Sequence, residues 1–136
     1  MATIKSFEEL EIWKLARDLS KAIFKLTGVK HFANDLRFKD QVRSASGSVM
    51  DNIAEGFERG GRLEFIQFLS VAKGSCGEIR SQGYRAFDYD YISEKELREI
   101  QYRTEELSVK IGNFITYLNK SIIKGSKFKD RKTDRN

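Results

Sequence analysis

The residue types that carry most enzyme chemistry are scarce in this sequence. It contains one histidine, His31, and one cysteine, Cys76. A histidine in a connection beside Phe32 is typical of a surface or capping residue, and a cysteine among small helical residues is typical of core packing. Neither a Glu-x-x-His metal motif nor a Gly-rich phosphate loop ending in Gly-Lys-Ser/Thr occurs. We therefore expect no catalytic residue, no metal site and no cofactor, and the sequence predicts a protein that is not an enzyme.

A stripe of hydrogen-bonding side chains stands out at about residues 35–55, a stretch that the sequence predicts to be helical. At about 100° per residue, four of these side chains fall within about 60° of one another, beside the apolar positions Val42 and Ile53. We call them the polar stripe: Gln41, Ser48, Asn52 and Glu55. Glu55 stands in the last predicted turn, where an acidic side chain opposes the helix dipole by about 0.3–1 kcal/mol. Such a departure from local preference indicates compensation by packing or by function.

Two interpretations of the polar stripe stay open. In the first, it is a half-buried contact surface against another helix or another subunit, and a cation such as Arg17 or Arg80 pairs with it. In the second, its side chains are solvated or cap the loop after Gly56. We prefer the first, because the stripe is short-chained and uncharged apart from Glu55, unlike an ordinary Lys/Glu-rich solvent face.

Positive charge is concentrated at the end of the sequence. The chain has 25 Lys and Arg against 20 Asp and Glu, a net charge of +5. Residues 124–136 carry six cations and two carboxylates, a net +4, which leaves about +1 for residues 1–123. Because this stretch lacks apolar periodicity, we expect a bundle domain at residues 1–123 and a disordered basic tail at residues 124–136. The tail is either a solubilising extension or an arm that attracts nucleic acid.

Cations of the tail and of the body are the candidates for contact with nucleic acid. We single out seven: Arg43, Arg80, Arg85, Lys127, Lys129, Arg131 and Lys132. Tyr84 and Phe87 stand beside the body arginines and add aromatic surface. The opposing consideration is that an arginine on a bundle surface is more often simply solvated.

Four amphipathic segments, at about residues 7–27, 35–55, 62–89 and 94–124, predict the fold. In each of them apolar residues recur at three- and four-residue steps. Ser6 with Glu9 and Ser93 with Glu96 are capping-box signatures, and Gly56 is expected to end the second helix as a left-handed cap. Short connections between long helices imply antiparallel neighbours, so we expect an all-α, up-down-up-down four-helix bundle.

Packing details and the compartment can also be inferred from the pattern of apolar and small residues. The run from Leu97 to Leu118 keeps a nearly unbroken heptad seam in which Thr104 is the one polar member. Gly74, Gly77 and Gly83 lie inside the third segment and predict a face for close helix packing, since glycine otherwise costs about 1 kcal/mol in a helix. No apolar run approaches the length of a membrane span, and the first residues do not resemble a signal peptide, so we expect a cytoplasmic protein.

Residues 41–56, QVRSASGSVMDNIAEG, resemble the signature of a small bacterial family, which reads approximately Q-[IL]-R-R-A-x-x-S-[IV]-x-x-N-I-A-E-G. Residues 7–13 and 64–79 fit its other blocks, so the resemblance covers about residues 7–120. The family consists of four-helix bundle proteins encoded in intervening sequences of large-subunit (23S) ribosomal RNA genes. The sequence departs from it at Ser44, where a second arginine is common, and this loss weakens any claim that the surface binds phosphate.

The resemblance implies a homopentamer, in the form of a ring or barrel, with no established catalytic activity. Its architecture is similar to that of the basic pentameric bundles that serve diversity-generating retroelements and bind nucleic acid and a reverse transcriptase. We therefore expect a homo-oligomer that binds RNA or DNA, or that assists a nucleic-acid-handling protein partner. The alternative is a protein–protein scaffold with no direct nucleic-acid role. In either case we expect Asn52 and Glu55 to hold the end of the second helix against a neighbour, with Arg43 as a further member of that contact.

Overall fold

The computed structural model describes residues 3–132, with side chains through Ser121, and all of its regular structure is helical. A single 3-10 turn precedes five α-helices. Their bounds are η1 Phe7–Glu9, α1 Glu11–Thr27, α2 Lys30–Asn34, α3 Leu36–Glu58, α4 Arg62–Asp88 and α5 Glu94–Lys132. The all-α fold class is therefore confirmed, with α2 as a short helix inside the expected connection between the first two long helices.

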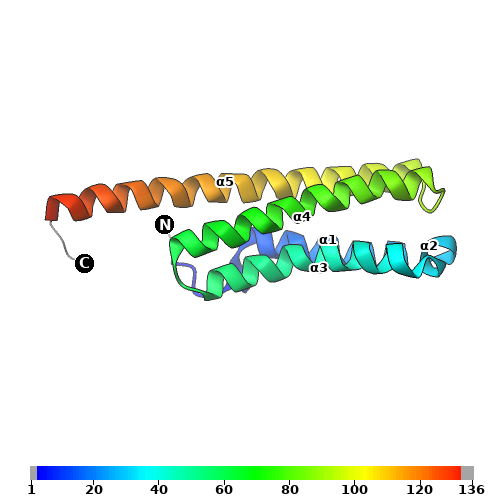
Figure 1. The fold of residues 1–136 in the computed structure, drawn as a ribbon, viewed down its shortest axis with the longest axis horizontal. Helices are drawn as coiled ribbons and strands as arrows, with labels where there is room; N and C mark the ends of the chain where they lie inside the picture. Colours follow the sequence, from blue (N-terminus) through cyan, green and yellow to red (C-terminus); the bar gives the residue numbers. More distant parts are fainter. Residues whose placement is uncertain (1–2, 133–136) are drawn as a thin grey trace.

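The four long helices lie side by side, and successive ones run in opposite directions, as the colours of Figure 1 show. Helix α3 packs against both α1 and α4, α4 packs against α5, and α5 packs back against α1. This arrangement follows from the sequence, because a short connection between two long helices makes the second helix run antiparallel to the first and pack against it.

The core lies where the apolar stripes of the four helices face one another. The heptad seam of α5 is confirmed at five apolar positions, which are buried: Leu97, Ile100, Leu107, Ile111 and Leu118. Phe114, its remaining apolar member, is half-buried and packs against the core. Thr104 is buried as well, and its hydroxyl donates to the carbonyl of Ile100 at 2.7 Å. A hydroxyl that bonds to its own helix can lie in an apolar seam without an unpaired polar atom.

The two predicted capping boxes have different outcomes. At the start of α5, the amide of Glu96 donates to the Ser93 hydroxyl at 3.1 Å and the amide of Ser93 donates to the Glu96 carboxylate at 2.8 Å, so this box is confirmed. At the start of the chain the prediction is wrong, because the Ser6 side chain makes no capping bond. Residues 7–9 form a 3-10 turn and α1 begins at Glu11, after the extended residue Leu10.

Gly56 does not end α3, which corrects a second expectation. The helix continues to Glu58, and the left-handed glycine is Gly60, with φ +85°. Gly56 is buried instead against α4: a Cβ at this position would lie 2.6 Å from Cβ of Phe68 and 3.0 Å from Cδ1 of Phe65. Glycine is needed here for the close approach of α4, not for a turn.

The glycines of α4 divide into packed and open positions. Gly83 is buried against α5, with the methyl Cγ2 of Ile100 3.2 Å from the position of a Cβ, as a close-packing face requires. Gly74 and Gly77 are exposed, and a Cβ at either one would meet nothing within 4 Å. The predicted packing face is therefore confirmed at Gly83 and absent within the protomer at Gly74 and Gly77.

Helix α5 ends later than the sequence predicts. Its backbone is helical to Lys132, eight residues past the expected end near Lys124, and it extends beyond the ends of α1, α3 and α4 (Figure 1). The side chains of residues 122–132 and all of residues 133–136 lie outside what the structure describes. The candidates Lys127, Lys129, Arg131 and Lys132 fall in this part of the chain. Within residues 3–132, no helix is long and apolar enough to cross a membrane.

Candidate functional site

The polar stripe lies on the side of α3 that adjoins α4, and one of its members, Ser48, bonds to α4 while Asn52 bonds to Ser48. The Ser48 hydroxyl is 3.0 Å from the hydroxyl of Ser75 on α4. The amide nitrogen of Asn52 donates to the carbonyl of Ser48 at 2.8 Å and to its hydroxyl at 2.9 Å. Ser48 and Asn52 are half-buried, whereas Gln41 and Glu55 are exposed. The structure thus joins the middle of the stripe to α4 and leaves both of its ends on the surface.

Glu55 pairs with a cation that is close to it in the sequence, Arg59. Its carboxylate pairs with Arg59 at 3.0 Å, and the same guanidinium reaches Glu64 of α4 at 3.3 Å. The bond to Glu55 raises the pKa of Arg59 above its ordinary value. Neither Arg17 nor Arg80 is the partner of Glu55. The reason is that α3 runs past Gly56, which places Arg59 four residues after Glu55 on the same helical side.

Arg43 joins α3 to the end of α1. Its Nε donates to the hydroxyl of Thr27 at 2.8 Å, and its Nη2 donates to the carbonyl of Phe24 at 3.2 Å. The guanidinium carbon also lies 4.0 Å from the centroid of the Phe24 ring. Because α1 ends at Thr27, the Phe24 carbonyl lies in its last turn, where it accepts from the Thr27 hydroxyl as well as from Arg43. The positive charge of Arg43 is favourable at this negative end of the helix.

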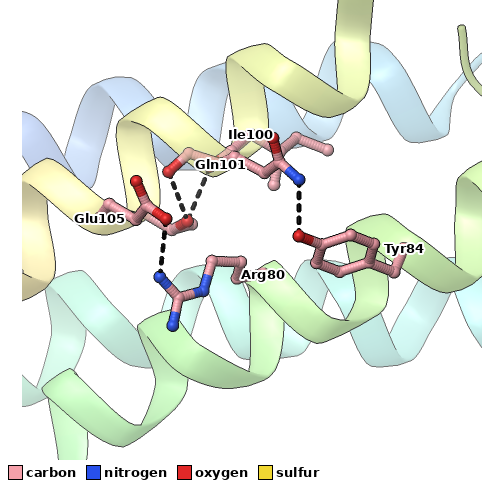
Figure 2. Close-up of polar contacts among 6 residues, drawn as sticks. Arg80, Tyr84, Ile100, Gln101 and Glu105 are labelled. Carbon is pink, nitrogen blue, oxygen red and sulfur yellow. Dashed lines mark hydrogen bonds and ion pairs between the residues drawn. The ribbon is translucent and has the colours of Figure 1, made fainter. Parts of the chain in front are cut away.

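Arg80 and Tyr84 tie α4 to α5. Figure 2 shows both side chains directed at α5, where Arg80 pairs with Glu105 at 3.1 Å and the Tyr84 hydroxyl accepts a bond from Gln101 at 2.7 Å. Arg85, the residue after Tyr84 on α4, has its guanidinium carbon 4.3 Å from the centroid of the Phe38 ring. All three arginines named on the body therefore have contacts inside the fold.

Neither residue singled out at first for chemical reactivity stands in a reactive setting. Cys76 is fully buried in the core, and desolvation raises the pKa of its thiol to about 12. His31 lies exposed on the short helix α2. Among the described residues, no three His, Cys, Asp or Glu side chains come close enough together to hold a metal ion.

A cationic face on α1 was not among the surfaces predicted from the sequence. Lys14, Arg17, Lys21 and Lys25 are exposed on this helix, on the side opposite the buried residues Ile12, Leu19 and Ile23. No ion pair joins any of the four to a carboxylate in the part of the chain that the structure describes. Their spacing of three, four and four residues is visible in the sequence and could have revealed them.

An open groove of about 690 Å³ runs between α3 and α4 at the other end of the polar stripe. Asp40, Gln41 and Ser44 line it from α3, and Glu78 and Gln82 line it from α4. Gln82 is 5% exposed; its amide nitrogen donates weakly to Glu78 at 3.4 Å, and its Oε1 has no partner. The groove thus holds two carboxylates, Asp40 and Glu78, and one guanidinium, that of Arg85, which also lines it.

Together, the antiparallel long helices, the buried heptad seam and the charged outer faces place the molecule in the class of small helical-bundle proteins. Within this class the family is shown by its sequence: the family model described as 23S rRNA-intervening sequence protein matches residues 8–113, and the chain belongs to that family. Members of the family have no established function.

A solved structure has the same fold. It is the crystal structure of a protein of unknown function from the S23 ribosomal protein family of Bacteroides thetaiotaomicron VPI-5482. The two chains superpose with a TM-score of 0.72 over 77% of this chain and 95% of the other, at 16% sequence identity, so the likeness is one of fold. No curated protein matches the chain significantly.

Proposed function

We propose that this protein is a non-enzymatic homo-oligomer, pentameric by resemblance to its family, that binds nucleic acid or assists a protein that handles nucleic acid. The observation that carries the proposal is the placement of the basic end of the chain. Six cations fall within residues 124–136, and the backbone of α5 carries most of this stretch past the rest of the bundle (Figure 1). Repeated in an oligomer, such helices would concentrate positive charge that attracts phosphate groups.

The contacts of the body arginines support the same assignment. Arg43 is bonded to the end of α1 and Arg80 is paired with Glu105, so neither guanidinium is free for a phosphate within the fold. On α5, positions 120, 124, 127 and 131 are four, three and four residues apart, a spacing that shares one side of a helix. Phosphate contact is therefore proposed for the end of α5 before any other surface.

A titration of the full chain with a structured RNA and with duplex DNA, at increasing salt, tests this function. We expect affinity to fall with salt for both ligands. Lys127→Gln/Arg131→Gln/Lys132→Gln should reduce the slope of log K against log salt by up to about three. The matched control, Lys30→Gln/Arg62→Gln/Lys95→Gln, removes the same charge from exposed positions and should leave the slope unchanged. Absence of binding at low salt would reject the nucleic-acid role.

A protein scaffold with no direct nucleic-acid role is the second candidate. It is favoured by Gly74 and Gly77 on α4, since glycine destabilises a helix and a Cβ at either position would meet nothing within 4 Å. Such open positions allow the close approach of a protein partner. Co-purification of a protein partner that survives nuclease treatment, together with no affinity for either nucleic acid, would support this candidate over the first.

A further inference from the structure

The cationic face of α1 has no carboxylate partner among the described residues of its own copy. The side chains of Lys14, Lys21 and Lys25 make no hydrogen bond or ion pair among the described residues, and the Arg17 side chain has only the Trp13 ring, 5.8 Å from its guanidinium carbon. Asp18 is the one carboxylate exposed among them. Like charges on neighbouring turns repel one another, so this face is stabilised by any surface that brings carboxylates to it.

The outer face of α3 has the opposite charge. From Asp40 to Glu58 the helix carries four exposed carboxylates, and Arg43, its one cation in that range, is turned toward α1. Asp40, Asp51 and Glu58 have no ion-pair partner in the described part of the chain. Unpaired cations on one helix and unpaired carboxylates on another form complementary surfaces within one sequence.

The surface between these carboxylates is open to a helix. Gly47 lies between Asp40 and Asp51 on α3, and a Cβ there would meet nothing within 4 Å. Next to it, the groove adds the exposed carboxylate of Glu78. The small residue permits a close approach, and the exposed carboxylates of Asp40, Asp51 and Glu78 can accept hydrogen bonds from ammonium and guanidinium groups.

We propose that the cationic face of α1 in one copy of this chain docks on the outer face of α3 and the adjoining α3–α4 groove of a second copy. This inference rests on the proposed homo-oligomer and assigns its interface. The spacings agree: Lys14 to Lys25 and Asp40 to Asp51 are both eleven residues, about 16 Å along a helix. Both ends of the cationic face therefore meet carboxylates of α3 at the same time.

The contact has a consequence for the symmetry of the assembly. It joins two different patches, so each copy offers α1 to one neighbour and α3 to the next. Heterologous contacts of this kind generate a ring when the rotation closes. Gln41 and Ser48 line the groove, which places this part of the polar stripe beside the same interface.

Charge reversal in full-length, nuclease-treated protein tests the interface by sedimentation velocity and light scattering. One chain carries Lys14→Glu/Lys25→Glu and the other Asp40→Lys/Asp51→Lys. Each alone brings like charges together, so its dissociation constant should rise by about tenfold or more. A third chain that combines all four reversals should recover the mass of the unaltered protein, since its reversed α1 face meets a reversed α3 face at every contact, whatever the number of subunits in the ring. Lys95→Glu/Lys120→Glu, at exposed positions of α5, is the matched control and should assemble normally.

The outcomes separate this interface from the oligomer itself. An unaltered protein that stays monomeric at all concentrations overturns both proposals. If the unaltered protein is an oligomer and the two singly reversed chains assemble equally well, the interface alone is overturned. The same holds if the chain with all four reversals is folded but stays dissociated. Circular dichroism establishes that each variant is folded, and Lys14→Gln/Lys25→Gln, which should weaken assembly less than the reversal, replaces any variant that loses its helices.

Discussion

Gly56 of α3 is closely packed, whereas Gly74 of α4 is open. Substitution by alanine should therefore change the free energy of unfolding in opposite directions at the two positions. In Gly56→Ala the new methyl would lie 2.6 Å from Cβ of Phe68, an atom fixed to the backbone of α4. The two helices must separate to admit it, and overpacking of this kind costs about 1–3 kcal/mol, more than the alanine gains in helix propensity. We expect a lower free energy of unfolding, measured by chemical denaturation.

Gly74→Ala is the matched control for this prediction. The same methyl meets nothing within 4 Å at this position, so the free energy of unfolding should rise by up to about 1 kcal/mol. Equal effects of the two substitutions would contradict the close approach of α3 and α4 at Gly56.

Arg43 shows at the same scale how contacts decide the role of a side chain. The sequence predicted two roles for Arg43: a phosphate contact, because it is an arginine, and a subunit contact, because it lies in the segment that resembles the family signature. In the structure its guanidinium reaches Thr27 and Phe24 of α1. Five donors in a planar fork allow one side chain to satisfy a hydroxyl, a carbonyl and a ring face together.

At the scale of the helix, the start of α5 depends on a reciprocal cap. Ser93→Ala removes the hydroxyl that accepts from the Glu96 amide, which leaves that amide without its partner. Loss of such a cap typically costs about 1 kcal/mol. We expect this decrease in the free energy of unfolding by denaturant titration.

Ser6→Ala provides the comparison, because Ser6 begins the same sequence motif but its side chain makes no capping bond. Its effect should stay within about 0.5 kcal/mol. A loss at Ser6 as large as that at Ser93 would mean that the first capping box forms after all.

At the scale of the whole molecule, the polar stripe is expected to matter for assembly. Asn52→Ala removes the bonds to Ser48 beside α4, and Glu55→Ala removes the anion paired with Arg59. We expect each to weaken self-association by about 1 kcal/mol, a factor of about five, because interface energy is concentrated in few side chains. Sedimentation velocity over a concentration series measures this.

Lys110→Ala is the control, since it removes a half-exposed surface ion pair with Glu11, and such pairs contribute about 0–1 kcal/mol. Equal sedimentation and equal melting temperatures for all three variants would remove the polar stripe from the interface.

Much of the fold could be predicted from the sequence, and the wrong predictions share a cause. The heptad seam and the Ser93 box were predicted correctly, because both depend on neighbours within one helix. Gly56 and the end of α5 were predicted wrongly. Gly56 was assigned by a local rule for helix ends, whereas the residue that demands glycine there, Phe68, belongs to another helix.

The sequence by itself determined the four long amphipathic helices, their antiparallel succession and the surplus of positive charge near the end of the chain. These properties depend on periodicity, on connection length and on composition, which are local or additive. Only the tertiary structure decided which side chains meet. Glu55 pairs with Arg59 and Arg43 bonds to the end of α1, whereas the lysine side chains of α1 pair with no carboxylate among the described residues. Partner choice depends on the rotation and register of one helix against another, and no spacing within a single helix specifies these.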